Sequence, residues 1–169
     1  MENEKLKELE AIKKEFDEKI TEEMRTEAMA RISSRMISTI ARHLIKDAGY
    51  SVATTILQRE FRNLGRNDAK EFIDTFELKK NDYKDASKAL KIAALFLGLK
   101  LDAIENETIV RDCPQGAEAI KFREPILCNA CSEYTNGILQ EMLGEGYVLE
   151  RTKWIFKGDS YCMFKIRKK

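Results

Sequence analysis

The chain has 169 residues, of which 43% are hydrophobic, so it is long enough and apolar enough to fold around one sizeable core. Its 30 Lys and Arg residues nearly balance its 29 Asp and Glu residues, whereas a dedicated nucleic-acid-binding protein would usually carry a basic excess. No apolar run reaches the roughly 18 residues that a membrane helix needs, and residues 1–20 are too charged for a signal peptide. We therefore expect a cytoplasmic protein with neither a nucleic-acid nor a membrane partner.

The first half of the sequence predicts helices. Residues 3–20 carry a thin apolar stripe at helical spacing, which is typical of a helix that packs on a partner. A longer helix is predicted from Thr21 to Asp47, where apolar residues recur every four positions. We expect these two amphipathic helices to form a homodimer; the alternative is that they pack within the chain's own core. The many Lys and Glu residues and the single His are a composition typical of thermophiles.

Three further helices are predicted before residue 99. Glycine is expected to end the first and third of these helices, and asparagine or aspartate is expected to begin the second and third. Their predicted bounds are Tyr50–Leu64 with Gly65 as the stop, Asn67 or Asp68 to Phe76, and Asp82 or Tyr83 to Leu97 with Gly98 as the stop.

The pattern then changes to strands around one helix. Residues 99–104 and 108–112 predict two strands joined by a tight turn at 105–107. Pro114 is expected to interrupt the second strand, and Pro125 to start a helix that Gly144 closes. Two final strands are predicted at 147–156 and 160–167.

The predicted organisation is a single domain over residues 1–169, mainly helical over 1–98 and β-β-α-β-β over 99–169. Helices followed by hairpins indicate an α+β fold, with N-terminal helices packed on a small antiparallel sheet.

All four cysteines lie in the last third of the chain. Cys128 and Cys131 share one face of a predicted helix, strand alternation turns Cys162 toward that helix, and Cys113 ends a neighbouring strand. Four thiols at one end of a helix–sheet interface match the ligand count of a closed zinc site, so the sequence predicts zinc bound by all four. Two alternatives stay open: buried thiols that pack as small hydrophobes, and a redox or catalytic cysteine pair.

Four short motifs carry a family resemblance. They are Glu124-Pro-Ile-Leu-Cys128, Thr135-Asn-Gly137, Val148-Leu-Glu150 and Gly158-Asp-Ser-Tyr-Cys-Met-Phe164. Over residues 90–167 the chain resembles the 4-vinyl reductase domain family, especially its archaeal stand-alone members. The resemblance implies a fold shared with nitric-oxide-sensing domains and Golgi transport-particle components. Trp154 stands where many members carry a cysteine.

The resemblance also implies function. Family members are thought to bind small, often hydrophobic molecules in a pocket between helices and sheet, some act as sensor domains, and their cysteines are proposed metal ligands. We assign the faces of the predicted helices and strands by their periodicity. The residues that this assignment directs toward such a pocket are Phe96, Leu99, Tyr134, Ile138, Trp154 and Phe164.

The sequence thus favours a small-molecule-binding, sensing or regulatory module with a zinc site, and we assign no catalytic residue. Two alternatives remain. One is a thiol-dependent hydrolase or reductase, since the chain shares a Cys-Pro and a terminal Gly-x-x-x-Cys-x-Phe with aminothiazoline-carboxylate hydrolase-like proteins. The other is a dimeric assembly or interaction protein. His43 is the single histidine, and we expect it to be an interface residue rather than a base.

Overall fold

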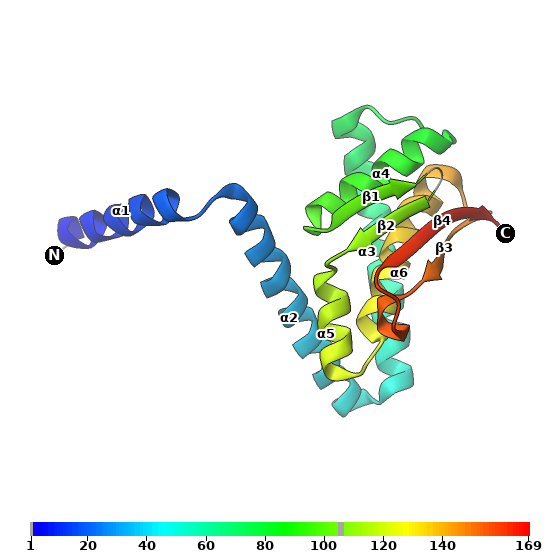
Figure 1. The fold of residues 1–169 in the computed structure, drawn as a ribbon, viewed down its shortest axis with the longest axis horizontal. Helices are drawn as coiled ribbons and strands as arrows, with labels where there is room; N and C mark the ends of the chain where they lie inside the picture. Colours follow the sequence, from blue (N-terminus) through cyan, green and yellow to red (C-terminus); the bar gives the residue numbers. More distant parts are fainter. Residues whose placement is uncertain (1, 105–106) are drawn as a thin grey trace.

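A four-stranded antiparallel sheet and two tiers of helices make up the body of the protein (Figure 1). The computed structural model describes the backbone of residues 2–104 and 107–169 and the side chains of residues 10–102 and 107–169. Helices α4 (Tyr83–Phe96) and α6 (Ile126–Leu143) pack on the sheet, and α3 (Tyr50–Phe76) packs on α6 from the other side. The predicted α+β class is confirmed.

The N-terminal helices begin and end where local chemistry requires. Helix α1 spans Glu2–Lys19 and projects from the body (Figure 1), and α2 spans Glu22–Ala48. The hydroxyl of Thr21 accepts a hydrogen bond from the backbone N–H of Met24 at 3.2 Å, so Thr21 caps α2. Gly49 ends α2 with a φ of 83°, a conformation that glycine adopts without steric cost.

Gly65 lies inside α3, so the prediction that it ends a helix is wrong. A Cβ at Gly65 would lie 2.0 Å from the carbonyl oxygen of Tyr134, and one at Gly137 of α6 would lie 2.2 Å from the carbonyl oxygen of Arg62. Both glycines are therefore needed for close helix packing, and α3 and α6 make the most extensive helix–helix contact in the described chain.

A helix that the sequence did not predict, α5 (Pro114–Phe122), follows the first hairpin. Pro114 occupies the first turn, where its missing N–H costs nothing. Cys113 caps this helix, because its Sγ accepts a hydrogen bond from the N–H of Gly116 at 3.3 Å. Pro114 therefore starts a helix as well as ending the strand. The cap of α4 is as expected, with Asp82 accepting from the N–H groups of Lys84 and Asp85 at 2.8 and 3.0 Å.

The sheet has the order β1-β2-β4-β3, and every neighbouring pair is antiparallel. Its strands are β1 (Lys100–Ile104), β2 (Glu107–Arg111), β3 (Tyr147–Lys153) and β4 (Cys162–Lys168). The predicted turn at 105–107 falls largely outside the described residues. A 3₁₀ turn at Ile155–Lys157 replaces the end of the strand predicted to reach residue 156. None of the helices in the described ranges is long and apolar enough to cross a membrane.

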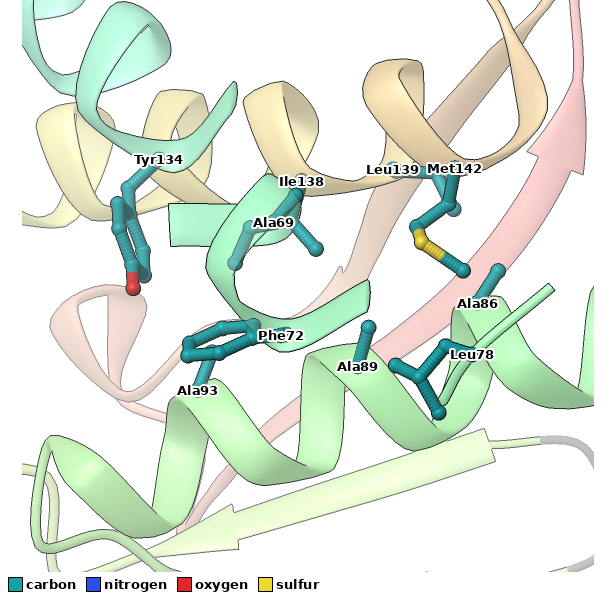
Figure 2. Packing of buried hydrophobic residues seen from close by; sticks show 10 residues of the cluster. All are labelled: Ala69, Phe72, Leu78, Ala86, Ala89, Ala93, Tyr134, Ile138, Leu139 and Met142. Atoms are coloured by element: carbon teal, nitrogen blue, oxygen red, sulfur yellow. The ribbon is translucent and has the colours of Figure 1, made fainter. Parts of the chain in front are cut away.

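The main core lies between α3, α4 and α6 (Figure 2). Ile138, Leu139 and Met142 extend from α6 and are at most 1% exposed. Full burial of such side chains contributes about 1.5–3 kcal/mol each. Small residues on α4, such as Ala86, let the helices approach closely.

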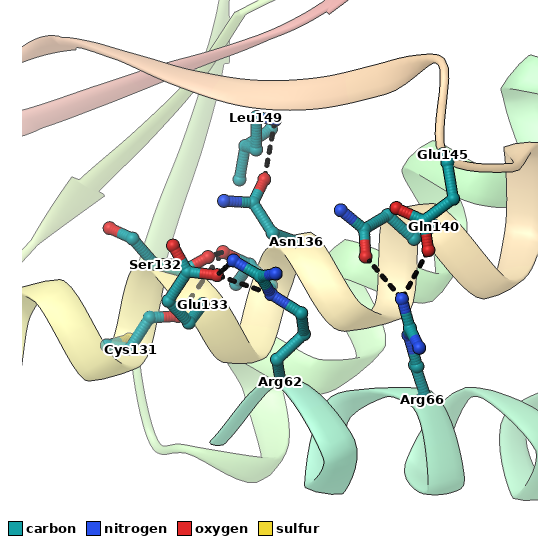
Figure 3. A network of polar contacts seen from close by, with 10 residues as sticks. Arg62, Arg66, Cys131, Ser132, Glu133, Asn136, Gln140, Glu145 and Leu149 are labelled. Atoms are coloured by element: carbon teal, nitrogen blue, oxygen red, sulfur yellow. Dashed lines mark hydrogen bonds and ion pairs between the residues drawn. The ribbon is translucent and has the colours of Figure 1, made fainter. Parts of the chain in front are cut away.

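Polar contacts fix α6 between the other layers (Figure 3). On the side of α3, Arg62 Nε donates to Glu133 Oε2 at 2.7 Å, and Arg66 Nη2 donates to Gln140 Oε1 at 2.9 Å. On the side of the sheet, Asn136 Oδ1 accepts from the backbone N–H of Leu149 at 2.9 Å. These contacts hold in place the helix that carries Cys128, Cys131 and Tyr134.

Candidate ligand-binding site and cysteine cluster

Helices α2, α3, α5 and α6 converge on a cavity of about 150 Å³, which we call the helical pocket. It is predominantly apolar, and a few polar side chains lie among its walls. Its lining residues are Ser34, Ile37, Phe61, Leu64, Asp68, Leu97, Gln115, Leu127, Cys131 and Tyr134.

One hydrogen bond organises the polar part of this pocket. The Tyr134 hydroxyl donates to Asp68 Oδ2 at 2.8 Å, joining α6 to α3. Burial of the phenol, together with this carboxylate acceptor, raises the pKa of Tyr134 above its usual range, so the hydroxyl keeps its proton. Ser34 is fully buried and donates to the carbonyl oxygen of Ala30 at 2.8 Å.

A second cavity of about 60 Å³ lies between α4, α6 and the sheet, and we call it the sheet pocket. Leu97 and Cys131 line both pockets, so these two side chains separate them. The other lining residues are Leu90, Lys91, Ala94, Leu99, Thr108, Ser132, Thr135, Leu149 and Phe164.

An open groove of about 660 Å³ runs between α2 and the C-terminal end of α4. It shares Ile37, Leu97 and Gln115 with the helical pocket, so the groove offers a route from solvent to that pocket. Its surface is mostly apolar and includes Met29 and Phe96, which are 58% and 71% exposed.

The six predicted ligand-binding residues are divided among these features. Leu99 and Phe164 line the sheet pocket, Tyr134 lines the helical pocket, and Phe96 lines the groove. Ile138 is fully buried in the main core, and Trp154 packs against Phe156 with ring centroids 5.4 Å apart. The structure therefore brings only Leu99 and Phe164 of the six into one pocket.

Of the residues that line the helical pocket, only Tyr134 was predicted from the sequence to bind a ligand. The polar residues that were missed are Asp68, Gln115 and Ser34. For Asp68 a signal existed. It follows Phe61 by seven residues and Leu64 by four, which places it on their face when the helix continues through Gly65, but the predicted stop at Gly65 assigned it to a separate helix. Gln115 belongs to α5, which was itself not predicted, so its position had no such signal.

The four cysteines gather in one region. Cys113 caps α5, Cys128 and Cys131 lie on α6, and Cys162 begins β4, where its Sγ accepts from the N–H of Ile155 at 3.4 Å. They are close enough to influence one another electrostatically.

Burial raises the pKa of three of the four cysteine thiols. It raises the pKa of Cys113 to about 11 and of Cys131 to about 12, and it also raises the pKa of Cys128. An activated nucleophilic thiol has a lowered pKa, so these three cysteines do not match one. His43 is exposed and faces Thr39, Arg42 and Lys46, and none of the four cysteines lines that surface.

Arg151 places a positive charge beside the cysteines. Its Nη2 donates to the carbonyl oxygen of Cys128 at 2.7 Å and also to the Ser132 hydroxyl. Its guanidinium lies 4.5 Å from the ring centroid of Trp154. This charge lowers the pKa of Cys128 and Cys131, but less than burial raises it.

The four cysteines have the right ligand chemistry for zinc, but their side chains are not spaced as a zinc site requires. Thiolates are preferred zinc ligands, and all four thiols lie in one region. Within the described residues, however, no three His, Cys, Asp or Glu side chains stand close enough to hold one ion. A shared site would require the thiols to move together, so zinc binding stays a prediction.

The fold is shared with proteins of known structure. No family model matches the chain, and no curated protein matches its sequence. Among solved structures, the chain is similar to the phenol-responsive sensory domain of the transcription activator PoxR with phenol. The TM-score is 0.60 and the identity 14%, over 80% of this chain and 74% of that one.

A second similar structure is a trafficking protein particle complex subunit 3 from Naegleria fowleri, covalently bound to palmitic acid. The TM-score is 0.62 and the identity 19%, over 85% of this chain and 96% of that one. At these identities the likeness establishes the fold, which agrees with the shared fold expected from the sequence.

Proposed function

We propose that the protein is a small-molecule-binding module whose ligand occupies the helical pocket. The observation that carries this proposal is the predominantly apolar cavity of about 150 Å³ between four helices. Engineered apolar cavities of about 150 Å³ bind benzene-sized molecules. Ligand sites are typically apolar with a few placed polar groups, and Asp68, Gln115 and Tyr134 fit that description.

The structural neighbours support the proposal. One is a sensory domain with phenol, and the other carries palmitic acid. Both ligands are small molecules with an apolar body, and both proteins share the arrangement of helices and sheet found here. We extend the proposal to a sensing or regulatory role and to membership of the 4-vinyl reductase domain family, which the four sequence motifs support.

A ligand panel tests the proposal. Toluene, aromatic alcohols and short aliphatic alcohols would be titrated while thermal stability and the fluorescence of Trp154 are followed. We expect at least one to stabilise the protein by about 2.7 kcal/mol at a hundredfold excess over its Kd. If no compound changes either signal, the binding proposal fails.

The cysteine cluster forms a second part of the proposal. We propose that Cys113, Cys128, Cys131 and Cys162 bind one zinc ion, which would deprotonate the thiols and contribute to folding. Support comes from their gathering at one end of α6 and from the backbone N–H groups that already donate to Cys113 and Cys162.

Exposed apolar surface supports a further proposal, a homodimer. On α2, Met24, Met29, Ile32, Met36 and Ile40 are each at least 48% exposed. On α1, which projects from the body, Phe16 is 46% exposed. Contiguous apolar surface of this kind commonly marks a protein interface. If the panel finds no ligand, an assembly protein that uses this surface becomes the better interpretation.

A further inference from the structure

Asp68 is an isolated negative charge in the helical pocket. Of the residues that line the pocket, none is a lysine, arginine or histidine. Within the described chain Asp68 forms no ion pair, and its hydrogen-bond donor is the Tyr134 hydroxyl, which approaches Oδ2. Its other oxygen therefore remains able to accept a hydrogen bond from a ligand.

Apolar side chains surround Asp68, so its free carboxylate oxygen needs a hydrogen-bond donor when a ligand displaces water. Phe61 and Leu64 lie on the same face of α3 as Asp68, and Leu97 and Leu127 close the pocket from other elements. A ligand that fills this space displaces water, and a carboxylate deprived of water needs a replacement donor. A hydroxyl or ammonium group supplies one, whereas a methyl group does not.

Tyr134 fixes the direction of the carboxylate. Tyr134 is 6% exposed and packs in the main core (Figure 2), so its hydroxyl has little freedom. Because the bond to Oδ2 holds the Asp68 side chain in one orientation, a ligand meets a preformed acceptor and loses less free energy in ordering it.

We propose that Asp68, oriented by Tyr134, selects ligands that carry a hydrogen-bond-donating head group on a benzene-sized apolar body. This inference rests on the proposed function and specifies its ligand class. A protonated amine binds most tightly because the hydrogen bond then joins opposite charges, a hydroxyl binds less tightly, and a carboxylate is repelled.

Four probes with the same ring and different head groups test this selectivity: benzylamine, benzyl alcohol, toluene and benzoate. Calorimetric titration should rank their affinities in that order. Benzylamine should bind at least about tenfold more tightly than toluene, since a hydrogen bond to a charged group contributes about 1.5–3 kcal/mol. Benzoate should show no binding.

An Asp68→Asn variant removes the charge and keeps the shape. It should lose the preference for benzylamine and bind toluene as the wild type does, which also shows that it is folded. Asp74→Asn, an exposed position on the same helix, is the matched control and should leave all four affinities unchanged.

Two outcomes overturn the inference in different ways. If all four probes bind equally, or benzoate binds as well as benzylamine, Asp68 does not face the ligand, although the pocket still binds one. If toluene and the other three all fail to bind, the proposed function falls together with this selectivity.

Discussion

Gly65 of α3 and Gly137 of α6 each face the backbone of the other helix at a single crossing. A Cβ on either residue would lie within 2.2 Å of a carbonyl oxygen across the interface, at Tyr134 or at Arg62. The crossing thus holds Tyr134 against α3, where its hydroxyl reaches Asp68. Helix packing and pocket geometry are coupled at these two glycines.

Replacing either glycine with alanine should destabilise the fold. The added methyl group meets backbone, which moves only with the whole helix, and overpacking of this kind costs about 1–3 kcal/mol. The gain in helix propensity, about 1 kcal/mol, offsets part of that cost. Urea denaturation of Gly65→Ala and Gly137→Ala should therefore give a lower free energy of unfolding.

Gly146→Ala is the matched control, because a Cβ at Gly146 meets no atom within 4 Å. It should leave stability nearly unchanged. If Gly65→Ala and Gly137→Ala proved as stable as this control, the close approach of α3 and α6 would be contradicted.

Local chemistry explains which helix boundaries were predictable. Thr21 and Asp82 act through their own neighbouring backbone N–H groups, so their capping roles follow from sequence alone. The role of Gly65 does not follow from sequence alone, because a glycine can either end a helix or permit close packing within one. Which of the two roles it has depends on contact with α6, some 70 residues away along the chain.

The pocket was harder to predict for the same reason. The sequence placed it between sheet and helices, where the sheet pocket lies, and it did not predict the helical pocket within the helical tiers. Its walls come from four helices whose relative positions are tertiary information. Because α5 was not predicted, no argument from the sequence alone placed Gln115 beside Ile37.

Tyr134 should contribute a measurable dependence of stability on pH. Its pKa is raised in the folded protein, so above pH about 10 the unfolded chain loses this proton first, and stability falls as pH rises. Below that pH both states keep the proton and Tyr134 has no such effect. Free energies of unfolding at about pH 8 and pH 11 should differ less for Tyr134→Phe than for the wild type. Equal losses in both would contradict this assignment.

The zinc proposal predicts about one metal ion per chain in protein purified without chelators. Cys128→Ser should lower that content, and chelation should lower the melting temperature of the wild type because metal binding stabilises the fold. Ser132→Ala, one turn further along α6, is a control that leaves all four thiols in place. A metal content well below one per chain would instead favour buried free thiols.

The homodimer proposal predicts twice the chain mass of 19.5 kDa in light scattering. Met36→Glu should shift the protein toward monomer without unfolding it, because Met36 is 61% exposed and its replacement disturbs no core. Deletion of residues 1–20 should also weaken the dimer. Asn67→Glu makes the same charge change on an exposed position of α3 and should have no effect. A wild-type mass near 19.5 kDa would refute the dimer.

Filling the helical pocket tests the central claim most directly. Ser34 lines that pocket and is fully buried, and its hydroxyl donates to Ala30 of the same helix, so Ser34→Leu would occupy the space that a ligand needs. Ser33→Leu places the same side chain on the adjacent, exposed position that lines the groove.

The measurement is the ligand-induced rise in melting temperature with benzyl alcohol. We predict a clear rise in the wild type and in Ser33→Leu, and none in Ser34→Leu. An undiminished rise in a folded Ser34→Leu variant would show that the ligand binds elsewhere, and no rise in the wild type would contradict a binding role for this pocket.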